Sequence, residues 1–549
     1  MTVPSTFEIS EFKLLSSSFA RLLEEINEAL NSPLFFEVNN RKFLKIILKK
    51  KILLLVTKID RKFLLVFVLS LVMVSSCSDD FIDVDPTEEN SEDFFNTEAD
   101  YQNALIGAYD MLQSSFMNVL LGEIASDNTL CGGESATDTP AFQQVDDMIH
   151  TPVNTQLRDI WSWMFAGVNR ANYILEFQDK LDFEGKDIVL GQARFLRAYF
   201  YFELVKWFGD VPLVVDQRIL FGQQFEVDRT PKTEVYAQIE QDLIYATSVL
   251  PLVQADIGRV TKGAAQSLLG KVYLYQDKFS EAANALENVI NSGQYQLLTD
   301  DYANMWENDY ENNMESVFEV QYTDVQGAGF GCFQCSEGNI AVGFNGIRNY
   351  SVEPGSVGDI FDSGYSFNVP TQETYDLYDD NDIRRDVSIL DMVTWAAEVG
   401  ATYVEGYEHT GFYNLKYLPR RGDLNTGDQN LTNPNNYRAI RYADVLLMAA
   451  EALNRGGIDE GRARLYLNEV RLRAGLAEVS SSGTGLTDDI YKERRLELVG
   501  EGHRFFDLVR TNTASENIEG FVSGKHEVFP IPSIEIDLTG NRWSQNPGY

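Results

Sequence analysis

The sequence predicts a mainly α protein, a single large body with helix pairs as its scaffold, from which long irregular loops and a few short strands project. Over most of residues 97–293 and 437–510, apolar residues recur three and four positions apart, as they do on one face of a helix. Segments 261–293 and 437–475 each read as helix, short turn and helix, about the size of a tetratricopeptide repeat. No Pro-rich or Gly/Ser-rich linker divides the chain, which favours one body.

Ahead of this body, residues 61–86 have the features of an export signal. Arg61 and Lys62 precede an apolar run over 63–74, which small residues follow. Twelve helical residues span only about 18 Å, short of the roughly 30 Å hydrocarbon core of a bilayer. We therefore predict a signal peptide at about 58–76 rather than a stable transmembrane helix. Residues 1–57 are interpreted as an upstream extension from a misplaced start, within a leader of residues 1–76.

The signal ends in Val74-Ser75-Ser76-Cys77, which resembles the lipobox of bacterial lipoproteins. Acyl chains on one cysteine would anchor the protein firmly, since each buried methylene contributes about 0.8 kcal/mol. We therefore predict lipidation at Cys77 and a lipidated, acidic tether over 77–98. The alternative, an unmodified buried cysteine after a core strand, does not account for the cations before the run or for "SDDF" after it.

Charge excludes one class of partner. The first 76 residues hold 11 of the 45 Lys and Arg and 7 of the 83 Asp and Glu, so the remainder carries 34 and 76, a net charge of −42. Such a surface repels phosphate backbones, and no basic stripe with interleaved aromatics is present. We expect no nucleic-acid binding.

Three cysteines remain after Cys77. Cys332 and Cys335 either form a local disulfide or stay as two free thiols. Zinc is disfavoured, because no second CxxC or nearby His pair completes four ligands. Redox catalysis is disfavoured too, because the pair lies in a glycine-rich loop. We predict no metal and no cofactor.

The helices of the body are expected in sequence order. The helix expected at 97–117 shows helical spacing through Tyr101, Leu105 and Ala108. The helix expected at 191–208 is stopped by Gly209 and Pro212. The repeat-like segments 261–293 and 437–475 supply two helices each. The other expected helical segments are 97–117, 157–177, 191–208, 233–250 and 491–510.

Between the repeat-like segments the character of the chain changes. Residues 315–323 predict a short strand, whereas 324–365 and 391–436 are expected to be irregular. Loops this long in a compact body are usually functional or disordered, and their aromatic residues argue against disorder.

Segment 491–510 is rich in charge. Glu493, Glu497 and Glu501 recur every four residues, with His503 after them, a pattern that an active site could use. The same segment carries an apolar stripe and Arg494. We therefore expect its charges to pair along the helix or to tie its end to a neighbour, and we predict no catalytic residue there.

The segment "ERRLELVGEGHRFFDLVR" resembles the C-terminal signature of the RagB/SusD family, cell-surface nutrient-binding lipoproteins of Bacteroidetes. Five further stretches resemble the family and follow in its order from about residue 100 to Tyr549. They are "ARFLRAYFYFELVKWFGDVPLV", "AAQSLLGKVYLYQDKFSEAANALENVI", "NVPTQETYDLYDDNDIRRDVSI", "RYADVLLMAAEALNR" and "VFPIPSIEIDLTGNRWSQNPGY".

The resemblance implies one domain over 99–549, with an N-terminal part at about 99–320 and a C-terminal part at about 321–549. Its scaffold would be four tetratricopeptide-like helix pairs. It also implies a protein that is lipid-anchored in the outer membrane, faces the cell exterior, captures oligosaccharides or polysaccharides and passes them to a SusC-like TonB-dependent transporter.

The ligand site is expected where the shared motifs stop. Sugars stack their C–H faces on aromatic rings and need polar partners for their hydroxyls, a combination found in segments 125–142 and 327–350. Trp306 and Trp395 are added as the tryptophans expected to reach a ligand, whereas Trp161, Trp163 and Trp207 are expected in the core. The remaining predicted ligand-binding residues are Asp127, Asn128, Phe330, Phe333, Phe344, Asn345, Arg348 and Tyr350.

Two other functions stay open at this point. A secreted glycoside hydrolase would need two carboxylates at a set separation. The chain has so many acidic residues that this requirement neither supports nor excludes a hydrolase. No HExxH, GxSxG or Walker motif is present, so we predict a binder and not an enzyme. A protein-binding helical-repeat adaptor would also fit the helix pairs, but it would bind peptides rather than glycans.

Overall fold

A computed structural model describes residues 94–549 apart from 216, 221, 222, 301, 328, 425 and 429. The chain divides into two units, residues 1–91 and 92–549. The predicted leader, the signal peptide, Cys77 and all but the last residues of the tether therefore lie outside the described residues.

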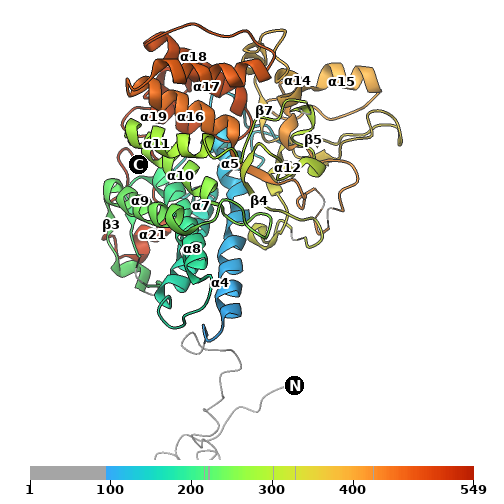
Figure 1. Cartoon of the computed structure of the whole chain (residues 1–549). Helices are drawn as coiled ribbons and strands as arrows, with labels where there is room; N and C mark the ends of the chain where they lie inside the picture. Colours follow the sequence, from blue (N-terminus) through green and yellow to red (C-terminus); the bar gives the residue numbers. More distant parts are fainter. Residues whose placement is uncertain are drawn as a thin grey trace, which may run out of the picture. The chain divides into compact units, whose positions relative to one another are not determined.

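The second unit has a helical scaffold, as predicted. Its long helices form four side-by-side pairs, α4 with α7, α8 with α9, α10 with α11, and α16 with α17. Figure 1 shows these pairs gathered on one side of the unit. Their bounds are α4 Glu98–Asp110, α7 Thr155–Glu176, α8 Lys186–Phe208, α9 Lys232–Val249, α10 Lys262–Leu274, α11 Phe279–Ile290, α16 Tyr442–Arg455 and α17 Glu460–Arg473.

Local signals set the helix ends. Asn154 caps α7 by accepting hydrogen bonds from the N–H groups of Gln156 and Leu157, and Thr261 caps α10 in the same way. The chain leaves α8 at Gly209, whose φ of +72° a residue with a side chain rarely adopts. Of the tryptophans expected in the core, Trp161 and Trp207 are buried and Trp163 is half-buried.

Further helices connect and cover the pairs. Two predicted helices prove to be broken: a 3₁₀ turn, Met111–Ser115, interrupts 97–117, and residues 499–503 interrupt 491–510. The second break follows from Gly500 and Gly502, which have φ of +81° and +78° and where a Cβ atom would come within 2.6 Å of Asn414 and 2.7 Å of Val119. The helices outside the four pairs are α5 Phe116–Ile124, α6 Pro140–Asp146, α12 Ile340–Asn345, α13 Gln372–Asp376, α14 Arg385–Ser388, α15 Met392–Val399, α18 Thr484–Leu498, α19 Arg504–Arg510, α20 Ala514–Asn517 and α21 Ser533–Leu538.

The strands pair two by two. The predicted strand in 315–323 is confirmed as β4, which lies antiparallel to β10. The other pairs are β1 with β7, β2 with β3, β5 with β6 and β8 with β9. Their bounds are β1 Thr129–Leu130, β2 Val211–Pro212, β3 Arg229–Thr230, β4 Ser316–Val320, β5 Ile347–Arg348, β6 Ser363–Gly364, β7 Val369–Pro370, β8 Ile389–Asp391, β9 Phe412–Asn414 and β10 Tyr437–Arg441.

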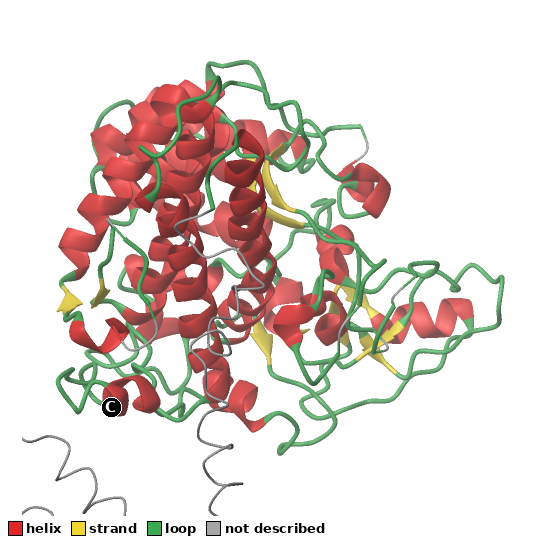
Figure 2. Cartoon of the chain, turned by 90° about the horizontal axis from the view of Figure 1, so that it is seen from below, coloured by secondary structure: helices red, strands yellow, loops and turns green. Residues whose placement is uncertain are grey.

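Segments 324–365 and 391–436 lie mostly beside the helical scaffold, where Figure 2 shows loops with short strands and helices. They are less irregular than predicted, since the first contains α12 and β5 and the second contains α15 and β9. Elements of two to eight residues leave too little periodicity for a sequence pattern to reveal them.

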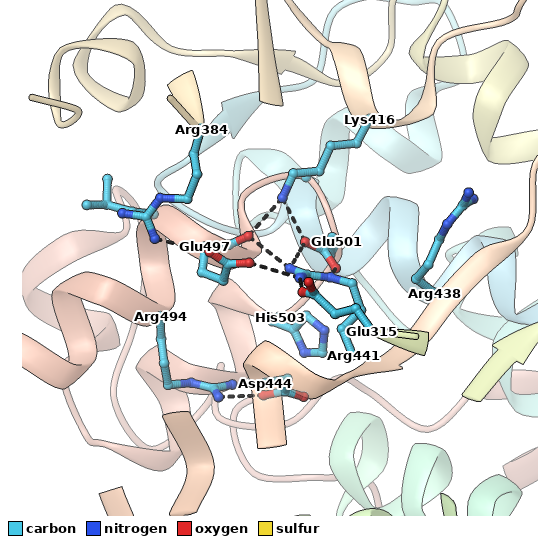
Figure 3. A network of polar contacts seen from close by, with 12 residues as sticks. Glu315, Arg384, Lys416, Arg438, Arg441, Asp444, Arg494, Glu497, Glu501 and His503 are labelled. Carbon is cyan, nitrogen blue, oxygen red and sulfur yellow. Dashed lines mark hydrogen bonds and ion pairs between the residues drawn. The ribbon is translucent and has the colours of Figure 1, made fainter. Parts of the chain in front are cut away.

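Ten charged side chains meet in the interior, and we call them the buried ion network. Arg441 lies at its centre and pairs with Glu315 at 2.8 Å, Glu497 at 2.9 Å and Glu501 at 2.8 Å (Figure 3). All of these side chains are 2% exposed or less apart from that of Arg471. The network consists of Glu315, Asp382, Glu493, Glu497 and Glu501 with Arg384, Lys416, Arg441, Arg471 and Arg473.

The network bears on the charges of segment 491–510. Burial alone would raise the pKa of the Glu497 carboxyl, but Arg473, Arg441 and Arg384 outweigh it and hold that pKa well below its usual value. These partners come from other parts of the chain and not from the same helix. The expectation that the charges tie the segment to a neighbour is therefore confirmed.

We expect replacement of Arg441 by Met to lower the free energy of unfolding by about 3–5 kcal/mol, because the five carboxylates of the network would then face only four cations. Urea unfolding at neutral pH measures this. The matched control is Arg462→Met, which removes the pairs of a largely exposed guanidinium with Asp459 and Glu287 and should leave the midpoint close to that of the wild type. Equal midpoints for the two variants would contradict a structural role for the network.

A second expectation concerns acid. Burial, reinforced by Lys271, lowers the pKa of His503 to about 3. Between pH 3 and 6.5 an unfolded chain protonates this histidine while the folded chain does not, so His503 makes stability fall as pH falls through this range. The His503→Asn variant should show a pH slope of stability shallower by up to about 1.4 kcal/mol per pH unit. His409→Asn, at a less buried position, serves as the control and should change the slope less; an unchanged slope for His503→Asn would contradict the assignment.

Candidate functional site

The most exposed aromatic surface predicted from the sequence lies in the glycine-rich loop. Phe330 is 56% exposed, and its ring centroid lies 6.1 Å from that of Phe333 and 5.6 Å from that of Tyr365. Phe333 and Tyr365 are half-buried, whereas Phe344 beneath them is buried at 5.9 Å from Phe333 and 6.0 Å from Tyr365. We call Phe330, Phe333 and Tyr365, with Phe344 as their support, the aromatic patch.

A disulfide holds the loop that carries the patch. Cys332 and Cys335 are bonded, which decides between the two alternatives that the sequence left open. The backbone N–H of Phe330 also donates to the Asp428 carboxylate at 2.7 Å. The disulfide restrains the turn that carries Phe333, and the hydrogen bond to Asp428 ties the backbone at Phe330 to a second segment.

Polar groups border the patch. The Arg348 guanidinium donates to the Tyr365 carbonyl oxygen at 2.6 Å and to the Ser366 hydroxyl at 3.2 Å, and it pairs with Asp138 at 3.4 Å. Asp138 belongs to segment 125–142, and the two predicted segments therefore meet at this arginine. Aromatic rings beside a guanidinium and a carboxylate are the groups that stack on a sugar face and hydrogen-bond its hydroxyls.

Asp127 and Asn128 lie apart from the patch. The Asp127 carboxylate pairs with Arg495 at 3.0 Å and Arg504 at 2.8 Å. The Asn128 side chain accepts from Arg495 at 2.8 Å and donates to the buried Glu123 at 3.1 Å. Their polar atoms fasten the start of segment 125–142 to α18 and α19, which is a structural use.

Trp306 also differs from its expected exposure. It is only 1% exposed, and its ring lies beside two cations of the buried ion network. The Lys416 Nζ lies 4.8 Å from the ring centroid and the Arg441 Cζ lies 5.3 Å from it. Asn345 is buried too, at the end of α12.

Tyr350 and Trp395 belong together. The Trp395 Nε1–H donates to the Tyr350 hydroxyl oxygen at 3.1 Å, and the Tyr350 hydroxyl in turn donates to the Gly358 carbonyl at 2.7 Å. Both residues pack in a small hydrophobic cluster separate from the main core that contains Phe344. The ten predicted residues are thus divided among the patch, a second cluster and the scaffold.

Sequence reasoning missed Tyr365 and Asp138. The signal for Tyr365 was an aromatic residue in "SGYSFN", directly before a family motif, and its distance from Phe330 in the chain hid their contact. Asp138 lies within a segment that was singled out, but nothing in the sequence pairs it with Arg348.

Within the part of the chain that the structure describes, no group of three or more His, Cys, Asp or Glu could hold a metal ion. Over the same residues, none of the helices combines the length and apolar character needed to cross a bilayer.

Comparisons with known proteins cover most of the chain. Residues 294–549 match the SusD family model, and residues 80–274 match a model described as starch-binding associating with outer membrane. SusD-like protein P2 of Formosa agariphila is 29% identical over 533 residues, which are 89% of this chain and 100% of that protein.

Solved structures agree with the sequence matches. A laminarin binding SusD-like protein is 36% identical with a TM-score of 0.75, and the similarity covers 83% of this chain and 100% of that one. Surface glycan-binding protein A from Bacteroides thetaiotaomicron, in complex with laminarihexaose, is 29% identical with a TM-score of 0.73 over 82% of this chain and 100% of its own. With both halves of the described unit matched and a 36% identical relative covered along its whole length, the chain belongs to the SusD family.

Proposed function

We propose that this protein is a cell-surface lipoprotein that captures oligosaccharides on the aromatic patch and delivers them to a SusC-like TonB-dependent transporter in the outer membrane. The observation that carries the proposal is the patch itself, three rings accessible in varying degree beside the Arg348 guanidinium and the Asp138 carboxylate. Its location on irregular segments outside the helix pairs fits a binding surface on a rigid scaffold.

The ligand class follows from chemistry and from relatives. Flat rings beside polar groups suit pyranose sugars, and two solved relatives carry laminarin or laminarihexaose in their names. We therefore propose laminarin-type glucans as the first ligands to test. Lipidation at Cys77 and a position facing the cell exterior complete the proposal, supported by the signal-like residues 61–77 and by the family model's association with the outer membrane.

The protein should bind glycans without cleaving them. In affinity electrophoresis through laminarin we expect the wild type to be retarded, and Phe330→Ala/Phe333→Ala to lose roughly 10- to 100-fold in affinity, because two stacking rings are removed. Leu465→Ala, an exposed apolar position on α17, is the control and should migrate like the wild type. Circular dichroism should show all three folded.

Three results would contradict this proposal. The first is undiminished laminarin binding by the double variant, which would show that the aromatic patch is not the binding site. The second is release of reducing sugar, which would indicate an enzyme. The third is the absence of retardation by laminarin, starch and other glycans, which would show that the protein does not capture glycans.

The disulfide provides a separate test. We expect Cys332→Ser/Cys335→Ser to bind laminarin several-fold more weakly, since an unrestrained loop must be ordered on binding. The melting temperature should change little, because the bond closes a very short loop. Wild-type protein treated with a reductant should behave like the variant, and equal affinities for the oxidised wild type and the variant would refute a positioning role for the disulfide.

A further inference from the structure

The molecule also has a cleft whose lining is separate from the aromatic patch. Its volume is about 800 Å³, within the range of sites that bind small ligands. Its walls come from residues 303–307, 359–361, 375–398 and 415–421, and no residue of the aromatic patch lines it.

The cleft has aromatic walls that are held in position. Trp395 is half-buried, and its ring is fixed by the hydrogen bond to Tyr350 and by an edge contact with Phe361 at 5.9 Å. Tyr375 also lines the cleft, half-buried and stacked on Phe412 at 4.5 Å. The Arg385 guanidinium carbon lies 5.1 Å from the Tyr375 ring centroid, so Trp395 is the main ring for stacking on the C–H face of a sugar and Tyr375 borders it.

The helix carrying Trp395 is fixed at its start. Asp391 caps α15 by accepting from the Thr394 N–H at 3.0 Å and from its hydroxyl at 2.7 Å. Trp395 therefore sits in the first turn of a capped helix, and little ordering is needed when a ligand binds.

The charges of the cleft favour a neutral ligand. Each of its arginines is already paired, Arg420 with Glu307, Arg421 with Asp359 and Arg385 with Asp386. Two further carboxylates, Asp391 and Glu398, also line it, so the described lining carries more negative than positive charge. Sulfated or uronic acid glycans would be repelled, whereas the paired ions still offer donors and acceptors to hydroxyl groups.

Trp306 borders the cleft from its buried position. Its indole Nε1 is shielded from solvent and has no hydrogen-bond partner among the described residues, so Trp306 forms part of the wall and offers no donor to a ligand.

We propose that this cleft is a second site for neutral oligosaccharides, separate from the aromatic patch and built around Trp395 and Tyr375. The proposal rests on the proposed function, since it assumes that the protein captures glycans. Two sites on one chain retain a long glycan more strongly than either site alone, because binding at the second becomes intramolecular.

The test is calorimetric titration of the full chain with laminarihexaose. We expect two sites in the wild type, one in Phe330→Ala/Phe333→Ala and one in Trp395→Ala, with the cleft weakened roughly tenfold or more by loss of the ring. The double variant should still show a change in tryptophan fluorescence on titration. Leu465→Ala should match the wild type. Tyr375→Leu keeps an apolar contact with Phe412 and should weaken the same site. It tests the cleft independently in case Trp395→Ala fails to fold.

The outcomes separate the two proposals. A single site in the wild type, with laminarihexaose binding unchanged in Trp395→Ala and Tyr375→Leu, overturns the proposed cleft site and is consistent with binding at the patch. Unchanged binding by Phe330→Ala/Phe333→Ala, with loss of all binding in Trp395→Ala, supports the cleft and overturns the patch. Loss of all binding in each of these two variants overturns the existence of separate sites, and no binding by the wild type overturns both proposals.

Discussion

The described unit depends on the compensation of charges buried in its interior. A carboxylate taken out of water is unstable unless cations and hydrogen bonds replace its hydration. The buried ion network has as many cations as carboxylates. Its members come from far apart in the chain: Glu315 precedes β4, Arg441 ends β10 and Glu497 lies in α18. The charges are satisfied only when these segments meet, so the network makes one arrangement of them much more favourable than the others.

The same network joins the scaffold to the segments that project from it. Lys416 comes from the second irregular segment and donates to Glu501 at 2.7 Å, while Arg384 pairs with Glu493 at 2.7 Å. Asp127 makes an equivalent connection at the start of segment 125–142 through its two arginines. Loops with little regular structure are thereby anchored at their bases, which leaves their tips free to present side chains.

Both proposed sites use that anchoring. The patch has a disulfide and a bond to Asp428 below its exposed ring, and the cleft has a capped helix and a hydrogen-bonded indole. Rings fixed in this way lose little conformational entropy on binding, so that more of the stacking energy appears as affinity. A protein that must capture a flexible sugar chain benefits from such preorganisation, because the ligand itself has to be ordered.

Local patterns in the sequence predict the helical scaffold, the repeat-like pairs, the strand at 315–323 and the segments in which a site should be sought. They can do so because the spacing that makes a helix and the glycines that end it act within a few residues. The role of each side chain, by contrast, follows from contacts made in the folded chain: Phe330 is exposed, Trp306 is buried, and Asp127 fastens a loop. Folding also brings Tyr365 to Phe330 and Asp138 to Arg348. Exposure and pairing of this kind depend on contacts between distant segments, which no local pattern records.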